Sequence, residues 1–222
     1  MKTLLLLLTL TTQLHAAPPK PYHLELEANP AAPFPFLGKF GTVTLHVFPA
    51  GLRVETFWLD GFTRNGARSV TVENPLGRVY TDVPLAEISA TLRKLSTSGV
   101  ENAAPGAITQ IAGNVKGIPA RRYRLVYGPE AWIDVWMTDR IPENPQLRAV
   151  VTEFVGGISP ATAVSISSLR GTPLYVELNF RRYKKLPLVR MKSITWSAAG
   201  EDDALKVGTL YFKAPLLDSI WK

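Results

Sequence analysis

Cysteine is absent from this 222-residue sequence. Its absence excludes disulfide bonds, thiolate catalysis and cysteine-based metal sites. Histidine is scarce as well: beyond the N-terminal segment only His23 and His46 remain, and neither has a second histidine at ligand spacing, so we expect no bound metal. A chain with about 200 residues after an N-terminal signal is long enough to be stabilised by one hydrophobic core. We therefore expect a single domain.

Motifs of catalysis are also missing. The segment 157–161, Gly-Ile-Ser-Pro-Ala, lacks the final glycine of a serine nucleophile elbow, and its proline suits a helix start instead. No glycine-rich loop of the kind that binds phosphate occurs. Carboxylate pairs such as Asp134 with Asp139, or Asp60 with Asp82, act as acid and base only if the fold brings them together. We expect no enzyme activity and no cofactor, and an uncharacterised hydrolase is the third alternative.

The first 16 residues are typical of a secretory signal peptide. They contain one lysine, a leucine run from Leu4 to Leu8 and a small residue at Ala16. The apolar stretch over 3–14 is shorter than the roughly 20 residues that a membrane-spanning helix needs. We therefore expect residues 17–222 to form the mature, periplasmic or secreted domain. Retention of the segment as a membrane anchor is the alternative.

Short segments in which apolar and polar residues alternate predict antiparallel strands. The clearest is the stretch from Gly171 to Trp196, whose two alternating halves are joined by a basic connection and predict a hairpin. Further strands are expected over 22–26, 38–48, 51–59, 69–73, 76–82, 108–111, 120–127, 131–138 and 205–213. Helices are expected after Pro84, Asn144-Pro145 and Ser159-Pro160, which are typical helix starts. A mainly β protein with two or three covering helices follows.

Acidic residues are absent between Leu178 and Gly200, whereas six cationic residues occur there. They are Arg181, Arg182, Lys184, Lys185, Arg190 and Lys192. This cationic patch is a candidate site for an anionic membrane surface or an envelope protein. A solvated hairpin tip, protected from edge pairing by its charges, is the alternative. Tyr183 is the only aromatic residue among these cations, so no nucleic-acid binding is expected.

Aromatic residues supply the candidate ligand site. Trp132 and Trp136 share one face of a predicted strand with Asp134, and Met137 lies on the other face. A strand that is apolar on both faces is either enclosed between sheet and helix or lines an apolar cavity. With Trp58 from an earlier predicted strand, the candidate lining residues are Trp58, Trp132, Trp136 and Met137. Plain core packing is the alternative.

Five short segments resemble a known fold family. They are Ile111-Ala112-Gly113, the strand from Arg122 to Val126, Val135-Trp136-Met137-Thr138, Gly171-Thr172-Pro173-Leu174 and Phe212-Lys213-Ala214-Pro215. With the order of predicted elements, they make the chain similar to the periplasmic lipoprotein-carrier superfamily, the LolA-like proteins, and to a secreted bacterial family of unknown function within it. The resemblance covers roughly residues 22–215. It implies a strongly curved antiparallel sheet that forms an incomplete barrel, with helices over its concave face.

The resemblance also implies a function without catalysis. A half-barrel of this kind holds an apolar ligand such as a lipid, an acyl chain or a lipoprotein. Our first expectation is therefore an exported, non-enzymatic binding protein. The alternative is an envelope interaction or sensor module that docks a protein partner, which a filled cavity and an exposed apolar patch elsewhere would favour.

Overall fold

The computed structural model describes residues 20–29, 41–95, 105–106, 108–181, 185–197 and 201–214. The predicted signal peptide lies outside these residues. The strands are β1 Tyr22–Ala28, β2 Thr42–Phe48, β3 Gly51–Glu55, β4 Asp60–Arg64, β5 Ser69–Asn74, β6 Val79–Pro84, β7 Ile108–Val115, β8 Ile118–Val126, β9 Ala131–Thr138, β10 Thr172–Phe180, β11 Leu186–Trp196 and β12 Phe212–Lys213. The helices are α2 Leu85–Leu95, α3 Pro145–Ile158, α4 Pro160–Ser167 and the short α5 Glu201–Ala204.

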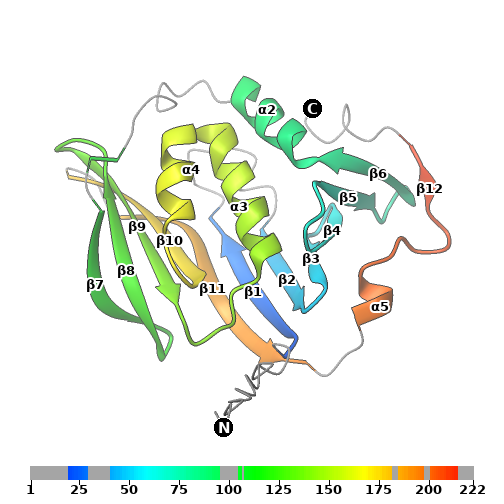
Figure 1. Ribbon diagram of the computed structural model, residues 1–222, viewed down its shortest axis with the longest axis horizontal. Coiled ribbons are helices and arrows are strands. Elements are labelled where there is room, and N and C mark those ends of the chain that lie inside the picture. The colour runs from blue at the N-terminus through cyan, green and yellow to red at the C-terminus, as the bar shows by residue number, and fades with distance from the viewer. Residues whose placement is uncertain are drawn as a thin grey trace, which may run out of the picture.

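All twelve strands belong to one curved sheet in the order β12-β6-β5-β4-β3-β2-β1-β11-β10-β9-β8-β7. Neighbouring strands are antiparallel, except that β12 runs parallel to β6. The sheet bends around α3 and α4 but does not close, because β7 and β12 remain at opposite ends (Figure 1). The predicted fold class, an open curved antiparallel sheet with a few helices over its concave face, is confirmed.

The two faces of the sheet differ in character. We call the concave face, on which α2, α3 and α4 lie, the helix-covered face, and the opposite one the outer face (Figure 1). One core cluster joins Tyr22 and Leu24 of β1 to Leu147 of α3. A second joins Val135 and Met137 of β9 to residues at and beyond the end of α4. Alternation along each strand sends the intervening polar side chains to the outer face.

Two helix starts follow from local capping chemistry. The Asn144 side chain accepts hydrogen bonds from the amides of Gln146 and Leu147, at 2.8 and 2.9 Å, and Pro145 occupies the first turn. Ser159 caps α4 in the same way, followed by Pro160. Each side chain satisfies amide groups that the first helical turn leaves without partners. Both predicted helix starts are confirmed.

The predicted strand over 205–213 is wrong. Residues 205–211, which follow α5, form neither strand nor helix, and within the predicted range Phe212 and Lys213 alone pair with β6. Leu205, which is 2% exposed, packs with Phe48 and Phe62 on the outer face. Leu205 therefore anchors the segment by a single side chain. The alternation of apolar and polar residues that begins at Leu205 does not come from strand pairing.

The packing of α2 on α3 depends on a glycine. A Cβ atom at Gly157 would lie 2.7 Å from the Leu92 Cβ and 2.8 Å from the Ser89 carbonyl oxygen, whereas one at Gly156 would make ordinary contact with Ala163 at 3.6 Å. We expect Gly157→Ala to lower the free energy of unfolding by about 1 to 3 kcal/mol, because overpacking forces the helices apart. Gly156→Ala is the control and should be neutral or stabilising by up to about 1 kcal/mol. Urea unfolding measures both, and equal effects would contradict the close packing.

Candidate functional site

The four predicted lining residues do not come together. Trp58 lies in the turn between β3 and β4, where it is 51% exposed and contacts the Phe57 ring edge-on at 4.8 Å. The predicted strand over 51–59 ends at Glu55 because the Thr56 hydroxyl accepts hydrogen bonds from the amides of Trp58 and Leu59. This exposed pair is therefore held by an ordered turn.

The three residues on β9 divide between the faces of the sheet. Met137 is 4% exposed and lies in the second core cluster with Val135, on the helix-covered face. Because side chains alternate along a strand, Trp132 and Trp136 point to the outer face. Met137 alone among the four faces the helices, and it is packed rather than open to a cavity.

The outer face around β9 carries an ordered strip of aromatic and charged side chains. Arg124 lies over the Trp132 ring at 4.9 Å and donates two 2.8 Å hydrogen bonds to the buried Asp134 carboxylate. Trp136 contacts the Tyr175 ring at 4.7 Å. Burial and a hydrogen bond to Glu177 raise the pKa of the Tyr175 hydroxyl. Arg124 and Asp134 are thus paired, whereas Glu177 Oε1 and Trp132 Nε1 are buried with no hydrogen-bond partner among the described residues.

The helix-covered face is apolar but incompletely closed beside α3. From Arg148 to Gly156 no residue of α3 is fully buried, although most are apolar. The sheet residues Val54 and Val72 face the same side, because both are paired with Gly61 across the ladder, and they too are only half-buried. Val54 and Val151 both pack against the first core cluster. Apolar surface of both layers therefore remains partly accessible here.

Direct polar anchors hold α3 to the sheet at its N-terminal end. The buried Gln146 side chain donates to the Thr63 hydroxyl at 2.9 Å and accepts from the Gly66 amide at 3.1 Å. The Asn144 amide donates to the Phe48 carbonyl oxygen at 3.1 Å. Nearer its other end, α3 bonds α2 instead, since the Ser89 hydroxyl donates to Glu153. The helix is thus fixed to the sheet at one end and to other helices at the other.

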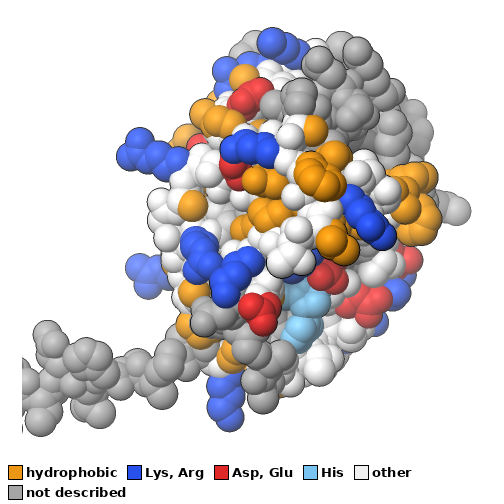
Figure 2. Space-filling model, turned by 90° about the vertical axis from the view of Figure 1, so that its right-hand side faces the viewer, with side chains coloured by type: hydrophobic (Ala, Val, Ile, Leu, Met, Phe, Trp, Pro, Cys, Tyr) orange, Lys and Arg blue, Asp and Glu red, His pale blue; other side chains and the backbone are white. Residues whose placement is uncertain are grey.

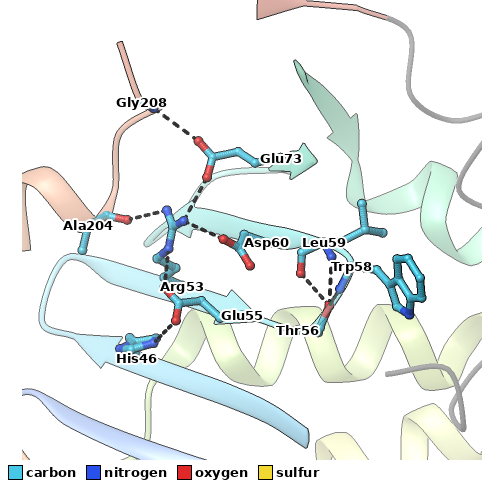
Figure 3. Close-up of polar contacts among 10 residues, drawn as sticks. All are labelled: His46, Arg53, Glu55, Thr56, Trp58, Leu59, Asp60, Glu73, Ala204 and Gly208. Carbon is cyan, nitrogen blue, oxygen red and sulfur yellow. Dashed lines mark hydrogen bonds and ion pairs between the residues drawn. The ribbon is translucent and has the colours of Figure 1, made fainter. Parts of the chain in front are cut away.

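A buried ionic network lies on the outer face between β2 and β5 (Figure 3). The Arg53 guanidinium donates to the carboxylates of Glu55, Asp60 and Glu73 at 3.0, 3.1 and 3.0 Å. The Glu73 side chain is only 2% exposed, and its other oxygen accepts from the Gly208 amide. Burial raises the pKa of Asp60, an effect that the Arg53 charge only partly offsets. Sequence analysis missed this network.

The network ties the C-terminal segment to the sheet. Arg53 donates to the Ala204 carbonyl oxygen, and Gly208 donates to Glu73 (Figure 3). His46 lies 2.9 Å from Glu55, close enough for an ion pair but outside hydrogen-bond geometry. Burial acts to raise the pKa of Glu55, but His46 and Arg53 outweigh it and hold that pKa below its usual range. Each charged group has a partner, so the network is best explained as an anchor.

The predicted cationic patch is partly neutralised by carboxylates of β1 and of the β8–β9 turn. Arg190 donates to Glu27 at 2.5 Å and Lys192 to Glu25 at 2.8 Å, while Arg181 lies 3.9 Å from Glu130. Lys185 is exposed, and Arg182 and Lys184 lie outside the described residues. The carboxylates come from other segments, which an inspection of the hairpin alone does not reveal.

A surface cleft of about 590 Å³, lined by both polar and apolar residues, opens between the β9–α3 and α4–β10 connections. Its charged lining includes Asp139, Glu143, Arg148 and Arg170, and none of the predicted lining residues. Glu143 pairs with Arg148 and accepts from the Gly171 amide, which lowers the pKa of Glu143. In the part of the chain that is described, no three histidine or carboxylate side chains are placed to hold a metal ion; the expectation of no metal stays a prediction.

Exposed apolar side chains are scattered rather than gathered into one cavity mouth. Figure 2 shows hydrophobic side chains among lysines and arginines, with the histidines beside acidic side chains. The large exposed ones include Phe57, Leu76, Leu210 and Phe212. Among the described residues, no helix is both long and apolar enough to cross a membrane.

Comparisons with known proteins give no family. No protein-family model and no curated protein matches the sequence. Two similar solved structures are MucB in complex with MucA(peri), at 12% identity and a TM-score of 0.38, and the MucA/MucB complex of Pseudomonas aeruginosa, at 10% and 0.37. The matches cover 86% of this chain but 55% and 56% of the others, so the chain spans about half their length. Similarity this low assigns no function, and the LolA-like resemblance stays a prediction.

Proposed function

We propose that this chain is an exported, non-enzymatic binding protein that takes an apolar ligand between α3 and the helix-covered face of the sheet. The ligand class is a lipid, an acyl chain or the acyl group of a lipoprotein. The observation that carries the proposal is the incomplete burial of apolar side chains along α3 and on the strands beneath it. When a ligand covers apolar surface that is still in contact with water, binding is stabilised by about 25 cal/mol for each Å² removed from water.

The anchoring of α3 supports a way for the ligand to enter. Asn144 and Gln146 hold the N-terminal end to β2, β4 and the β4–β5 turn, while the far end contacts α2 and α4. Helix pairs slide or tilt more readily than sheet ladders break. The far end of α3 therefore moves with its helical neighbours, and the ligand replaces contacts that are already incomplete.

Docking of a protein partner is the second candidate function. The buried position of Met137 and the exposed Phe57 and Trp58 favour it, because apolar side chains on an ordered turn are typical of contact sites. In this alternative the helix-covered face is only a core.

Native mass spectrometry distinguishes the two functions. The protein is purified without detergent and offered oleate or phosphatidylglycerol in equimolar amounts. A stoichiometric complex supports the first function. A bare chain after exposure to both ligands would contradict it and leave partner docking.

A charge placed on the inner side of α3 should abolish ligand binding. We expect Val151→Asp to weaken oleate binding by about tenfold or more, because a carboxylate must be desolvated where the acyl chain lies. Thr152→Asp, one residue along the same helix, is the matched control and should change the affinity less than about threefold. Fluorescence titration measures the affinities, and circular dichroism checks that both variants remain folded. Equal effects of the two substitutions would place the ligand elsewhere.

A further inference from the structure

The two edges of the sheet are protected to different degrees. At one edge β12 covers the start of β6, which also carries Asp82 in an ion pair with Lys213 and ends in Pro84. At the other edge β7 pairs only with β8, and seven of its eight residues are exposed. Of the described strands, none pairs with the open side of β7.

The strand β7 lacks the features that usually protect an edge. Its sequence, ITQIAGNV, contains no charged residue and no proline. It pairs with β8 over its whole length, from Ile108 opposite Leu125 to Val115 opposite Ile118, with no bulge. Natural sheets block such edges with lysine, proline, bulges or a covering segment, because free backbone groups otherwise pair with another chain.

Gly113 supplies an independent observation. A Cβ atom there would meet Trp136 at 3.5 Å and the Ala120 carbonyl oxygen at 3.7 Å, which are ordinary contacts. The residue is not among those with positive φ. Nothing described within the chain therefore requires glycine at this position. A glycine inside a strand often marks a bulge, a tight bend or the close approach of a ligand or another backbone, and the β7–β8 pairing has no bulge.

The surroundings of β7 are cationic. Arg122 lies on the neighbouring strand opposite Ile111 and contacts the Trp136 ring at 5.9 Å, and among the described residues it forms no ion pair. Lys116, at the β7–β8 turn, donates to the Lys192 carbonyl oxygen of β11. Hydrogen bonds from Lys192 and Arg190, and to a lesser extent the Lys116 charge, lower the pKa values of Glu25 and Glu27 on β1. Arg122 is therefore the cation beside β7 that has no acidic partner among the described residues. A strand added outside β7 would lie about 10 Å from β8, two strand spacings. Arginine and glutamate side chains together span that gap.

We propose that β7 is a docking edge for an extended, acidic segment of a partner protein, which adds to the sheet as a thirteenth strand. The backbone of the segment bonds the open side of β7, and a carboxylate of the segment pairs with Arg122. A second copy of this chain is a poorer occupant, because it would bring two molecules of formal charge +7 together. The site is separate from the apolar ligand site and does not depend on it.

A peptide titration tests the proposal. The probe is a nine-residue peptide that alternates threonine and valine and carries glutamate at both ends and at its centre, with a lysine version as control. We expect the acidic peptide to bind about tenfold or more tightly than the basic one, and Arg122→Gln to weaken it by about three- to tenfold. Fluorescence anisotropy measures the affinities. No binding of the acidic peptide at about 1 mM, or equal binding of both, would overturn the proposal.

Two proline substitutions test the edge itself. The amides of successive residues in an edge strand point to opposite sides, so of Thr109→Pro and Gln110→Pro one removes an outward donor and the other a donor to β8. We expect the substitution that leaves the melting temperature unchanged to weaken peptide binding by about tenfold. Unchanged binding in that variant would overturn the proposal. So would a dimer in light scattering that the same variant dissociates, because a second copy would then occupy the edge.

Discussion

Replacement of Arg53 by leucine is expected to lower the free energy of unfolding by about 3 to 5 kcal/mol at neutral pH. Arg53 is the only cation that contacts Glu73 and Asp60 among the described residues. Glu73 is almost fully buried, so its charge would be left without compensation. The substitution also removes the hydrogen bond to Ala204 and frees the C-terminal segment. Arg64→Leu is the control. In the C-terminal segment that is described, the Arg64 side chain donates to the Leu205 carbonyl oxygen alone, and loss of this hydrogen bond should lower the free energy of unfolding by about 1 kcal/mol.

The Arg53→Leu defect should depend on pH with a definite sign. Burial already raises the pKa of Asp60 in the folded protein, and removal of the guanidinium raises it further. A carboxyl whose pKa is raised on folding stabilises the protein below its unfolded value of about 4 and loses that contribution as pH rises. The difference between variant and parent should therefore shrink as pH falls from 7 toward 4.5. Urea unfolding across this range measures it, and a constant difference would show that the lost contacts are not electrostatic.

The sequence predicted the features whose causes are local. Asn144-Pro145 and Ser159-Pro160 start helices because the capping side chain bonds amides two or three residues away. Alternation predicted the strands and divided Trp132 and Trp136 from Met137, because the period of a strand is two. It could not say which face the helices cover, and so it grouped residues that the fold separates.

Register explains what the sequence analysis missed. Glu55 lies opposite Asp60, and Asp60 opposite Glu73, so carboxylates of three strands converge on Arg53. The predicted strand over 51–59 runs past Glu55, and Asp60 was considered with Asp82, so the turn over residues 56–59 that places Glu55 opposite Asp60 was missed. The Glu25 and Glu27 partners of the cationic patch were missed for a different reason. They lie on β1, more than 150 residues away in the chain, and only the sheet order brings β1 beside β11.

The two proposed sites make different demands on the same sheet. Ligand entry beside α3 requires that the helix layer move while the strands stay fixed. Strand addition at β7 requires an edge that is ordered before the partner arrives. On the outer face the Arg124–Asp134 ion pair joins β8 to β9, and Trp136 and Tyr175 pack against the first core cluster. Ion pairs and aromatic packing on the outer face thus keep the strands fixed while the helix layer moves.

Asn144 should be the residue that decides whether α3 stays attached to the sheet. It performs two tasks, since its oxygen caps α3 and its amide nitrogen donates to the Phe48 carbonyl oxygen. We expect Asn144→Ala to lower the free energy of unfolding by about 2 to 4 kcal/mol. Loss of a helix cap costs about 1 kcal/mol, and a buried carbonyl left without a hydrogen-bond partner costs about 1 to 3 kcal/mol. Asn144→Ser retains a capping hydroxyl but not the bridge, and should cost about half as much.

The comparison of these variants separates the anchor from the cap. Ser159→Ala removes the cap of α4 without touching the sheet directly, and urea unfolding should show a loss of about 1 kcal/mol. If Asn144→Ser is as stable as the parent, the bridge to Phe48 contributes nothing, and Gln146 supplies the polar anchor of α3 on the sheet. If it is destabilised as expected, the same variant should also bind oleate differently from Ser159→Ala. A helix released at its anchored end no longer holds the ligand against the sheet, so the affinity should fall although the apolar side chains are unchanged.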